Sequence, residues 1–325
     1  MIVITGQEYS SPKVNDSYLP DAADMEHGRA SKTRVSPLVT IRGEGFGLPS
    51  SHYLPFVSSG GILSADTSSL GQSSQVAVES QPAFTKQVFT KLSIIVPVYN
   101  ERQTVLELLR AVMSQEVGLR KELIVVDDFS TDGTREYLQK MDLPGLFGQN
   151  GDSARLVLHD RNRGKGAGVR TGLAEATGEL VLIQDADLEY DPSDFPALLK
   201  PILDGRADAV FGNRFHYGTH RVPRFYRYVL NRIFSGLCCS LTGLALHDVT
   251  ACYKAFTREV LGRIHLRSNR FSFETEITVK LAKIGARIYE VPIVYYGRTY
   301  AEGKKISWKD GVAALYHLFK YRFFD

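Results

Sequence analysis

The sequence predicts an α/β fold in which helices cover both faces of a mostly parallel sheet. Four apolar runs rich in Val, Ile and Leu lie between residues 92 and 184, and helical stretches separate them. Strands that are hydrophobic along their whole length are typical of parallel sheets buried on both faces. A chain of 325 residues is long enough to bury a full hydrophobic core in one or two domains.

The expected elements alternate in a regular order. Each strand is a short apolar run, and the four are expected at residues 92–96, 123–126, 156–159 and 180–184. The helices between them are expected at about 105–112, from the turn at 130–134 through Leu138, and at about 166–176. The first helix is supported by four apolar residues at helical spacing, Val105, Leu108, Leu109 and Val112.

Ligands of open parallel sheets bind beyond the carboxyl ends of the strands. The acidic and aromatic side chains expected on that rim are Tyr99, Asp127, Asp128, Asp185 and Asp187. The first strand ends in PVYNE, where Tyr99 offers a flat face for a base and Glu101 an acceptor for a ribose or base. The second ends in VVDDFSTDGT, where the paired acids could accept hydrogen bonds from a nucleoside. A capping role for Asp127 and a plain turn at 132–133 are equally open.

The segment LVLIQDADLEYDP, residues 180–192, gives the strongest signal. Its strand ends in four carboxylates within seven residues, Asp185, Asp187, Glu189 and Asp191. Like charges this close raise one another's pKa unless a positive group lies among them. Ligands made only of oxygen suit Mg²⁺ or Mn²⁺, which bridge protein carboxylates to substrate phosphates. The segment therefore predicts a divalent metal site, and a solvated acidic loop is the alternative.

The glycine-rich stretch NRGKGAGVRTG, residues 162–172, does not match a P-loop, which needs GxxxxGK[ST] directly after a strand. It also does not match the dinucleotide fingerprint, which should open the first βα unit rather than the third. Its glycines could let the backbone approach a diphosphate, with Lys165 or Arg170 nearby. A tight helix entry without a ligand is equally compatible with the pattern.

Charge is unevenly distributed along the chain. From Arg214 to the end, 19 Lys and Arg stand against 8 Asp and Glu, whereas residues 1–213 carry 20 against 28. A basic C-terminal third suggests phosphates, an anionic membrane surface or nucleic acid, and a solvated basic face is the alternative. Nucleic acid is not expected as a partner, because the cations lack interleaved recognition motifs.

The first 89 residues differ in composition from the rest of the chain. They contain fifteen serines and no sustained helical or strand periodicity, which predicts a mostly disordered tail before a folded domain at 90–325. Neither a signal peptide nor a membrane-spanning helix is expected. Three cysteines without the spacing of a zinc site or a disulfide framework fit a reducing compartment, and they are Cys238, Cys239 and Cys252.

Two stretches with helical periodicity bear on membrane contact. The first apolar stripe comes after Arg221, Arg224 and Arg227 and consists of Leu230, Ile233, Phe234, Leu237, Leu241 and Leu244. The second lies beside Lys309, Lys320 and Arg322 and consists of Trp308, Val312, Leu315, Phe319 and Phe323. Helices with an apolar face and flanking cations can lie in a membrane interface. We expect this of the first stripe and leave the second open between a membrane-facing and a core-facing helix.

The strand-end motifs, in their order, resemble those of a known family. IIVPVYNE, IVVDDFSTDGT, RNRGKGAGVRTGLAEATGE, DADLEYDP and GNRF look like the motifs of family 2 glycosyltransferases, which have the Rossmann-like GT-A fold. DVTACYKAFTREVL and GRTYAEGKKIS narrow the resemblance to the dolichyl- or polyprenyl-phosphate mannosyltransferases. The resemblance covers about residues 91–310. It implies a GT-A domain with a basic, amphipathic acceptor-side region at about 214–325.

The resemblance also implies roles for residues that match the family's motifs. The nucleoside would be held by Pro97, Tyr99, Glu101, Val126 and Asp128. The sugar diphosphate would lie along Asp185, Ala186 and Asp187, and Mg²⁺ or Mn²⁺ would bind Asp187 and Glu189, with Asp185 beside them. Glu189 departs mildly from the family, which often has Gln there. Asp187 is also a candidate catalytic residue, together with the cations implied to contact phosphates, Arg214, Arg298 and Lys304.

The implied activity is an inverting, metal-dependent transfer of a hexose, mannose from GDP-mannose, to a polyprenyl or dolichyl phosphate. An ionised lipid phosphate needs no general base, whereas a hydroxyl acceptor would, and Asp248 or Glu274 is available for that role. The alternative role for either carboxylate is to orient an arginine. The enzyme would act peripherally on the cytoplasmic face of a membrane, and a membrane-anchored partner subunit is compatible with this. Two alternatives stay open. One is a family 2 transferase using UDP-glucose, UDP-N-acetylhexosamine or a glycan hydroxyl acceptor, and the other is a non-catalytic nucleotide-sugar-binding subunit.

Overall fold

The computed structural model describes residues 88–215, 225–298 and 308–324, without the side chains of 308–310. The described residues all belong to one unit of the chain, Val76–Asp325. Nearly all of the segment expected to be disordered, 1–89, therefore lies outside the described residues, and its disorder stays a prediction.

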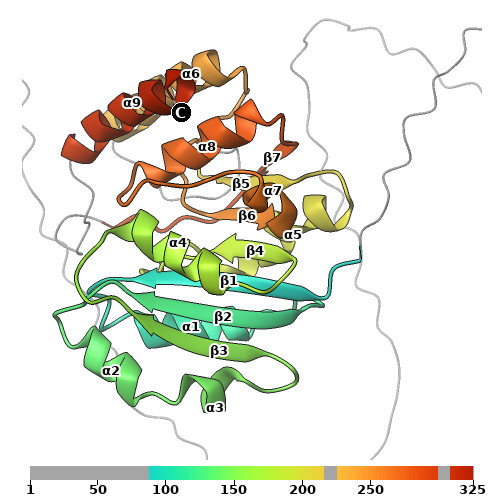
Figure 1. Cartoon of the computed structure of the whole chain (residues 1–325), viewed down its shortest axis with the longest axis vertical. Helices are drawn as coiled ribbons and strands as arrows, with labels where there is room; N and C mark the ends of the chain where they lie inside the picture. Colours follow the sequence, from blue (N-terminus) through green and yellow to red (C-terminus); the bar gives the residue numbers. More distant parts are fainter. Residues whose placement is uncertain (1–87, 216–224, 299–307, 325) are drawn as a thin grey trace, which may run out of the picture. The chain divides into compact units, whose positions relative to one another are not determined.

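Seven strands of the described chain form one sheet (Figure 1). They are β1 (Lys91–Val98), β2 (Arg120–Asp127), β3 (Ser153–Leu158), β4 (Leu180–Ile183), β5 (Ala209–Asn213), β6 (Lys254–Thr257) and β7 (Ile288–Pro292). Their order is β3-β2-β1-β4-β6-β5-β7. Only β6 runs antiparallel to its neighbours among these strands, so the mostly parallel sheet is confirmed.

Helices cover both faces of the sheet, as the sequence predicts (Figure 1). The described helices are α1 (Val105–Met113), α2 (Thr134–Lys140), α3 (Leu143–Phe147), α4 (Lys165–Glu175), α5 (Phe195–Leu203), α6 (Phe225–Thr242), α7 (Arg258–Gly262), α8 (Phe273–Lys283) and α9 (Trp308–Phe323). A short 3₁₀ turn, η1 (Pro192–Asp194), precedes α5. Helices α1, α3 and α5 pack on one face of the sheet, and α4, α7 and α8 pack on the other.

The side chains of β1 show why both faces need cover. Leu92, Ile94 and Val96 are fully buried in the core formed with α1 and α5. Ile95 points to the opposite face, where it packs under α4. Helix α4 can approach this closely because Gly172 faces Ile95, and any Cβ at that position would clash with the isoleucine side chain.

Helices α6 and α9 lie outside α8 and form a further layer (Figure 1). A separate cluster holds the three helices together, and its buried members are Cys238, Val249, Val279, Leu318 and Tyr321. The apolar stripe expected on α6 is divided between two environments. Leu230 and Ile233 are exposed, whereas Phe234, Leu237 and Leu241 pack against the cluster. Of the arginines expected before α6, Arg221 and Arg224 lie outside the described residues.

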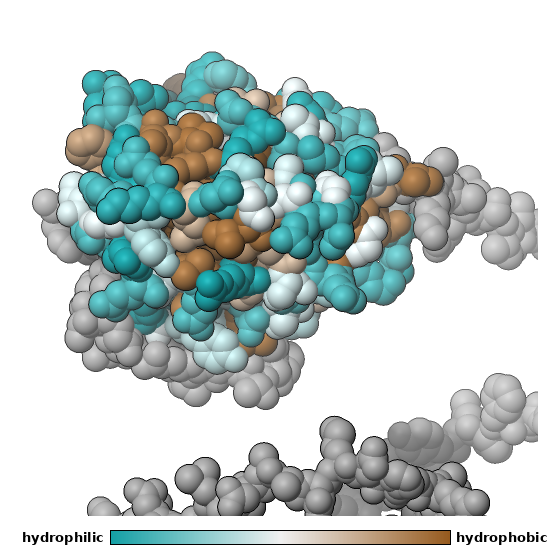
Figure 2. Space-filling model, turned by 90° about the horizontal axis from the view of Figure 1, so that it is seen from below, coloured by the Kyte–Doolittle hydropathy of each residue, from teal (hydrophilic) through white to brown (hydrophobic). Residues whose placement is uncertain are grey.

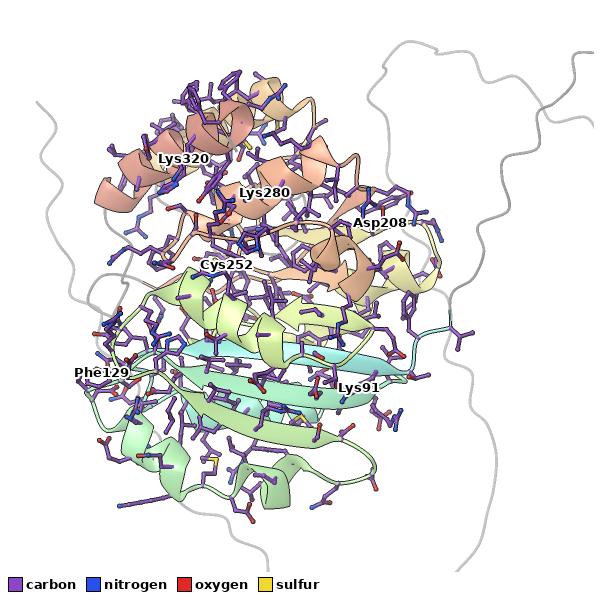
Figure 3. All side chains as sticks on the ribbon, viewed as in Figure 1. Lys91, Phe129, Asp208, Cys252, Lys280 and Lys320 are labelled. Atoms are coloured by element: carbon purple, nitrogen blue, oxygen red, sulfur yellow. The ribbon has the colours of Figure 1, made fainter. Side chains whose placement is uncertain are left out.

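A buried carboxylate ties together the strand starts, at the edge of the sheet marked by Lys91 in Figure 3. Glu122 of β2 accepts hydrogen bonds from Ser93 Oγ at 2.6 Å, Thr177 N at 2.7 Å and Lys91 Nζ at 3.0 Å. Arg155 Nη2 lies 3.2 Å from the same carboxylate. Burial by itself would raise the pKa of Glu122, but these partners lower it to about 2.

We expect Glu122→Gln to lower the free energy of unfolding by about 3 kcal/mol at pH 7, because the folded state favours the ionised carboxylate. This stabilisation is present above the unfolded pKa and is lost as the pH falls from about 4.5 towards 2. Denaturant unfolding at several pH values would measure both effects. Glu175→Gln is the matched control, since Glu175 is a half-exposed partner of Arg155 and should contribute less than about 1 kcal/mol. Equal losses in the two variants would contradict the prediction.

Candidate active site

The candidate site lies beyond the carboxyl ends of β1, β2 and β4. In Figure 3, Lys91 at the start of β1 and Phe129 just after β2 mark the two opposite edges of the sheet. At the Phe129 edge the chain encloses a cleft of about 390 Å³. Ten of the residues predicted for the site line this cleft, namely Pro97, Tyr99, Glu101, Asp128, Asp185, Ala186, Asp187, Glu189, Arg214 and Arg298.

Two predicted residues are not among those that line the cleft. Val126 is fully buried in the apolar layer between the sheet and α4, so its side chain supports the strand and does not face the cleft. Lys304 lies outside the described residues, so its role stays a prediction.

Arg298 joins three of the carboxylates. Its Nη2 atom donates to Asp187 Oδ2 at 2.6 Å, and both terminal nitrogens donate to Glu101 at 3.2 Å. Its backbone N–H donates to Glu189 Oε1 at 2.7 Å, and the other oxygen of Glu189 accepts from the Tyr295 hydroxyl at 2.8 Å. The Nε atom of Arg298 lies 3.5 Å from Glu189 Oε1, so one guanidinium serves three carboxylates. When all three are ionised, this part of the cleft has an excess of two negative charges.

The pKa of Asp187 reflects this shortage of positive charge. Burial, with the charges of Asp185 and Glu189, raises the pKa of Asp187 to about 7, although Arg298 opposes the shift. An additional cation beside Asp187 would restore its ordinary ionisation.

These residues fit a divalent cation by their donor chemistry and charge. Carboxylate oxygens are the ligands that Mg²⁺ and Mn²⁺ prefer, and a charge of two would match the excess. Within the described ranges, however, no three His, Cys, Asp or Glu side chains are grouped closely enough to hold a metal by themselves. Both oxygens of Asp187 and both oxygens of Glu189 already accept hydrogen bonds within the protein, whereas Lys165 pairs with one oxygen of Asp185, Oδ1. The metal-ligand roles stay predictions.

A row of alternating charges runs from the cleft into the interior of the domain. Lys165, at the start of α4, has its Nζ 2.6 Å from Asp185 Oδ1 and 3.8 Å from Glu274 Oε1. The other oxygen of Glu274 lies 2.7 Å from Lys254 Nζ. Burial alone would lower the pKa of Lys165, but the charges of Asp185 and Glu274 raise it well above its ordinary value. A permanently charged ammonium group therefore borders the cleft beside Asp185.

Arg214 is held by a fully buried carboxylate. Its Nε and Nη2 atoms donate to the two oxygens of Asp248 at 2.7 and 2.8 Å, and Nη2 also donates to Thr250 Oγ1 at 2.8 Å. Burial would raise the pKa of Asp248, but Arg214 lowers it below the ordinary value. Of the two roles open for Asp248, general base or partner of an arginine, the structure places it in the second.

Asp128 organises the glycine-rich stretch. Its carboxylate accepts from the backbone N–H groups of Arg163 and Gly164 at 2.8 and 2.7 Å, and His159 Nδ1 lies 2.7 Å away. Gly164 has a φ of 92°, which glycine adopts without strain, and α4 begins at the next residue. A side chain at Gly166 would meet the carbonyl of Ser268. The glycines thus permit a close-packed helix entry, and Lys165 is the member of the stretch that contributes charge to the cleft.

Sequence reasoning missed several residues that line the cleft, among them Tyr190, Thr250, Cys252, Arg270, Phe271 and Tyr295. Tyr190 and Tyr295 form an isolated antiparallel bridge. It joins the acidic segment 185–191 to the residues between the end of β7 and Arg298. The signal that could have found Tyr295 is its place three residues before Arg298. Arg270 and Phe271 carry no comparable motif, since only the packing of α8 beside α4 brings them to the cleft.

The order and directions of the strands, with a ligand cleft beyond their carboxyl ends, are those of the GT-A fold. The chain belongs to Glycosyl transferase family 2, whose sequence pattern it matches over residues 93–264. It is 31% identical over 206 residues to a protein of Haloferax volcanii named Glycosyltransferase AglJ, with 63% of each chain covered. It is 28% identical over 234 residues to a Dolichol-phosphate mannosyltransferase of Pyrococcus furiosus, covering 71% of this chain and 63% of the relative. The chain thus spans less than two thirds of the length of these relatives.

Among solved structures, the fold is similar to that of glucosyl-3-phosphoglycerate synthase from Mycobacterium tuberculosis, crystallised with Mn²⁺, uridine diphosphate and phosphoglyceric acid. The TM-score is 0.56 at 20% sequence identity, and the match covers 73% of this chain and 80% of the other. At this level of identity the likeness supports the shared fold.

Proposed function

We propose that the protein transfers a hexose, mannose from GDP-mannose, to a polyprenyl or dolichyl phosphate at a membrane surface. The observation that carries the proposal is the cleft itself, where Asp185 and Asp187 follow β4 within reach of Arg298 and Lys165. Such a site offers oxygen ligands for a cation and cationic groups for phosphates. Membership of the family and the similarity to a dolichol-phosphate mannosyltransferase support the choice of substrates.

The proposed reaction is a single displacement with inversion. An oxygen of the acceptor phosphate attacks the anomeric carbon, a new carbon–oxygen bond forms, and the bond to the nucleoside diphosphate breaks on the opposite face. The leaving diphosphate takes the electron pair, so cations near its oxygens stabilise the developing charge. When bound at Asp187 and Asp185, Mg²⁺ or Mn²⁺ would supply part of that charge. Arg298 and Lys165 supply the protein's own share.

The two buried carboxylates that were candidates for a general base, Asp248 and Glu274, are both paired with cations. Their pairing favours a phosphate over a hydroxyl acceptor. A hydroxyl would need a general base in the cleft. Asp248 is committed to Arg214 with a lowered pKa, and Glu274 is paired with Lys254. An ionised phosphate needs no base, and the arginine held by Asp248 would attract it.

Exposed apolar residues on α6 and α9 support action at a lipid surface. The two helices lie next to each other, since Arg322 Nε of α9 donates to the carbonyl of Leu241 in α6 at 2.5 Å. Their exposed apolar side chains are Phe225, Tyr226, Tyr228, Leu230, Ile233, Val312, Leu315, Tyr316, Phe319 and Phe323. Figure 2 views the other end of the described domain, from below, where α2 and α3 lie in Figure 1, and there hydrophobic residues occur in patches between hydrophilic ones. No described helix is both long and apolar enough to cross a bilayer.

A donor and acceptor screen tests the proposed reaction. Purified protein with Mn²⁺ is given GDP-mannose, UDP-glucose or UDP-N-acetylglucosamine, each labelled in the sugar, together with dolichyl phosphate in detergent. Transfer of mannose into an organic-soluble, acid-labile product supports the proposal. Turnover with a UDP-sugar alone would show that the donor is not GDP-mannose. Label found only in water-soluble glycan would show that the acceptor is not a lipid phosphate. Binding of a nucleotide sugar without turnover would favour a non-catalytic subunit.

Arg298→Gln should weaken binding of GDP with Mn²⁺ by about tenfold to a hundredfold, because it removes charge-assisted hydrogen bonds to phosphate. Calorimetric titration measures the affinity. A thermal melt should show a lower melting temperature, because Glu101, Asp187 and Glu189 lose their shared cation, so the titration is made well below that temperature. Arg287→Gln is the control, because Arg287 makes a comparable pair with Asp208 on the outside of the sheet. An unchanged GDP affinity in Arg298→Gln would remove this residue from the donor site.

The membrane contact is tested by a double substitution on α6, Leu230→Asp with Ile233→Asp. Both side chains are more than 60% exposed, so the variant should fold normally. We expect its partition onto anionic vesicles to fall by more than about tenfold, since burial of each side chain in lipid is worth at least about 1.5 kcal/mol. Leu146→Asp, at an exposed position of α3, should bind vesicles like the wild type. Equal binding of all three proteins in a flotation assay would argue against α6 as the contact.

A further inference from the structure

One wall of the cleft is a segment without regular structure, residues 265–271, which carries Arg270 and Phe271. On one side this segment is fixed to α4. Arg170 donates to the carbonyl of Ser268 and, at 2.6 Å, to Asn269 Oδ1. The backbone N–H of Ala167 donates to the carbonyl of Asn269 at 3.0 Å. The wall is therefore held against the helix that presents Lys165 to the cleft.

On its other side the segment is fixed by a buried polar cluster that reaches α9. Glu276 of α8 accepts from the backbone N–H groups of Arg267 at 2.7 Å and Ser268 at 2.6 Å. Lys280 Nζ, one turn further along α8, lies 2.9 Å from Glu276 and 4.9 Å from the ring centre of Tyr321 (Figure 3). The hydroxyl of Tyr321 lies 2.8 Å from Ser268 Oγ, within hydrogen-bonding distance. Each of these side chains except that of Arg267 is buried.

Tyr321 lies on a helix whose opposite side is exposed and apolar. Tyr321 is 2% exposed, whereas Tyr316 on the same helix is 64% exposed and Phe323 is 59% exposed. The residue that binds the cleft wall and the residues that would enter a lipid surface are thus parts of one rigid element. A helix that is restrained at its outer face transmits the restraint to hydrogen-bonded partners at its inner face.

We infer that Tyr321 and Ser268 form a positioning pair, which couples the docking of α9 onto a lipid surface to the order of the cleft wall that carries Arg270. The inference rests on the proposed action at a membrane surface and adds a regulatory step to it. Ser268 stands two residues from Arg270, so a restraint on Ser268 restricts where that guanidinium can lie. The pair acts through Arg270 and has no contact with a substrate of its own.

Hydrogen exchange of the full-length protein, with and without vesicles of phosphatidylcholine and phosphatidylglycerol, tests the coupling. In the wild type, vesicles should slow amide exchange in residues 265–271. In Tyr321→Phe this slowing should fall by about fivefold, the equivalent of one buried hydrogen bond, while vesicle binding stays at the wild-type level. Ser268→Ala should behave like Tyr321→Phe, and the double variant should lose no more than either single one.

Tyr316→Phe is the matched control, because it removes an exposed hydroxyl from the same helix and should retain the full effect of vesicles. GDP affinity in the presence of Mn²⁺ and absence of vesicles should be equal in all variants, which a general loss of structure would not allow. Vesicle binding without any slowing at 265–271, or with equal slowing in Tyr321→Phe, would overturn the inference and leave the proposed function standing. Absence of vesicle binding by the wild type would overturn both the proposed membrane contact and the inference.

Discussion

Asp187→Asn should lower glycosyl transfer by about a thousandfold, while the melting temperature stays at or above that of the wild type. Activity should fall because the amide lacks the negative charge that would hold a divalent cation beside the leaving diphosphate. Stability should hold because burial and the charges of Asp185 and Glu189 already disfavour an ionised Asp187. Removal of that charge relieves repulsion and offsets the weakened bond to Arg298. Initial rates at saturating Mn²⁺ and a thermal melt measure the two quantities.

The matched control is Asp191→Asn, four residues further along the same acidic segment. Asp191 accepts from the backbone N–H of Ser193 at 2.9 Å and caps η1, a role that an amide oxygen can also fill. This variant should keep its activity. Chelation of divalent ions should inactivate the wild type as strongly as the Asp187 substitution does. Substantial activity in Asp187→Asn would mean that Asp187 is not where the cation and the diphosphate meet.

The parallel part of the sheet was predictable because its strands are apolar throughout. The runs at β1, β2, β3 and β4 have almost no polar interruption, and the structure places each within a few residues of its predicted bounds. Strand ends in a parallel sheet meet at one edge, so the rim that carries Asp128, Asp185 and Asp187 could be predicted from strand order alone.

The remaining strands were missed for physical reasons that are visible in β6. This strand has four residues, and its first, Lys254, is fully buried. A lysine at a strand start indicates an exposed position, since an isolated ammonium is rarely buried. Here Glu274, from α8, provides the counter-charge at 2.7 Å. Because that partner is twenty residues away, local pattern could not reveal the strand.

Helix α6 shows a different limit of periodicity. Its apolar stripe was correctly recognised as helical, but it does not lie on one surface. Leu230 and Ile233, in the first half, are exposed, whereas Phe234, Leu237 and Leu241 pack on the layer formed with α8 and α9. Spacing identifies the apolar side of a helix, but it cannot show where along the helix the core ends. For the same reason the sequence could not show whether α9 faces the core or a membrane. In the structure α9 has both a buried and an exposed apolar side.

The candidate site was predictable as a set of residues and not as a set of contacts. Motif order placed Glu101, Asp187 and Arg298 in one site, and the structure brings them together. That one guanidinium serves three carboxylates depends on the path of the chain between 189 and 298, which runs through β5, β6 and β7. The pairing of Arg214 with Asp248 could not be predicted either, because the two residues lie 34 positions apart in the sequence, on either side of α6.

Asp248→Asn should lower the free energy of unfolding by about 3 to 5 kcal/mol, because it leaves the buried guanidinium of Arg214 without a counter-charge. Asp248 is fully buried, and its two oxygens take the Nε and Nη2 atoms of Arg214 at 2.7 and 2.8 Å. An amide can accept at one of these positions but not at both. Since Arg214 also lines the cleft, activity should fall along with stability. Denaturant unfolding monitored by circular dichroism measures the loss.

A double-mutant cycle separates the two roles of this pair. Arg214→Met alone should also destabilise, because Asp248 then becomes the unpaired buried charge. Combined in one chain, Arg214→Met with Asp248→Leu should recover most of the stability, since an apolar pair of similar volume avoids the desolvation of both charges. The same double variant should stay inactive, because a thioether cannot attract the acceptor phosphate. Recovery of activity together with stability would show that Arg214 serves the fold alone, whereas recovery of stability without activity assigns the guanidinium to the reaction.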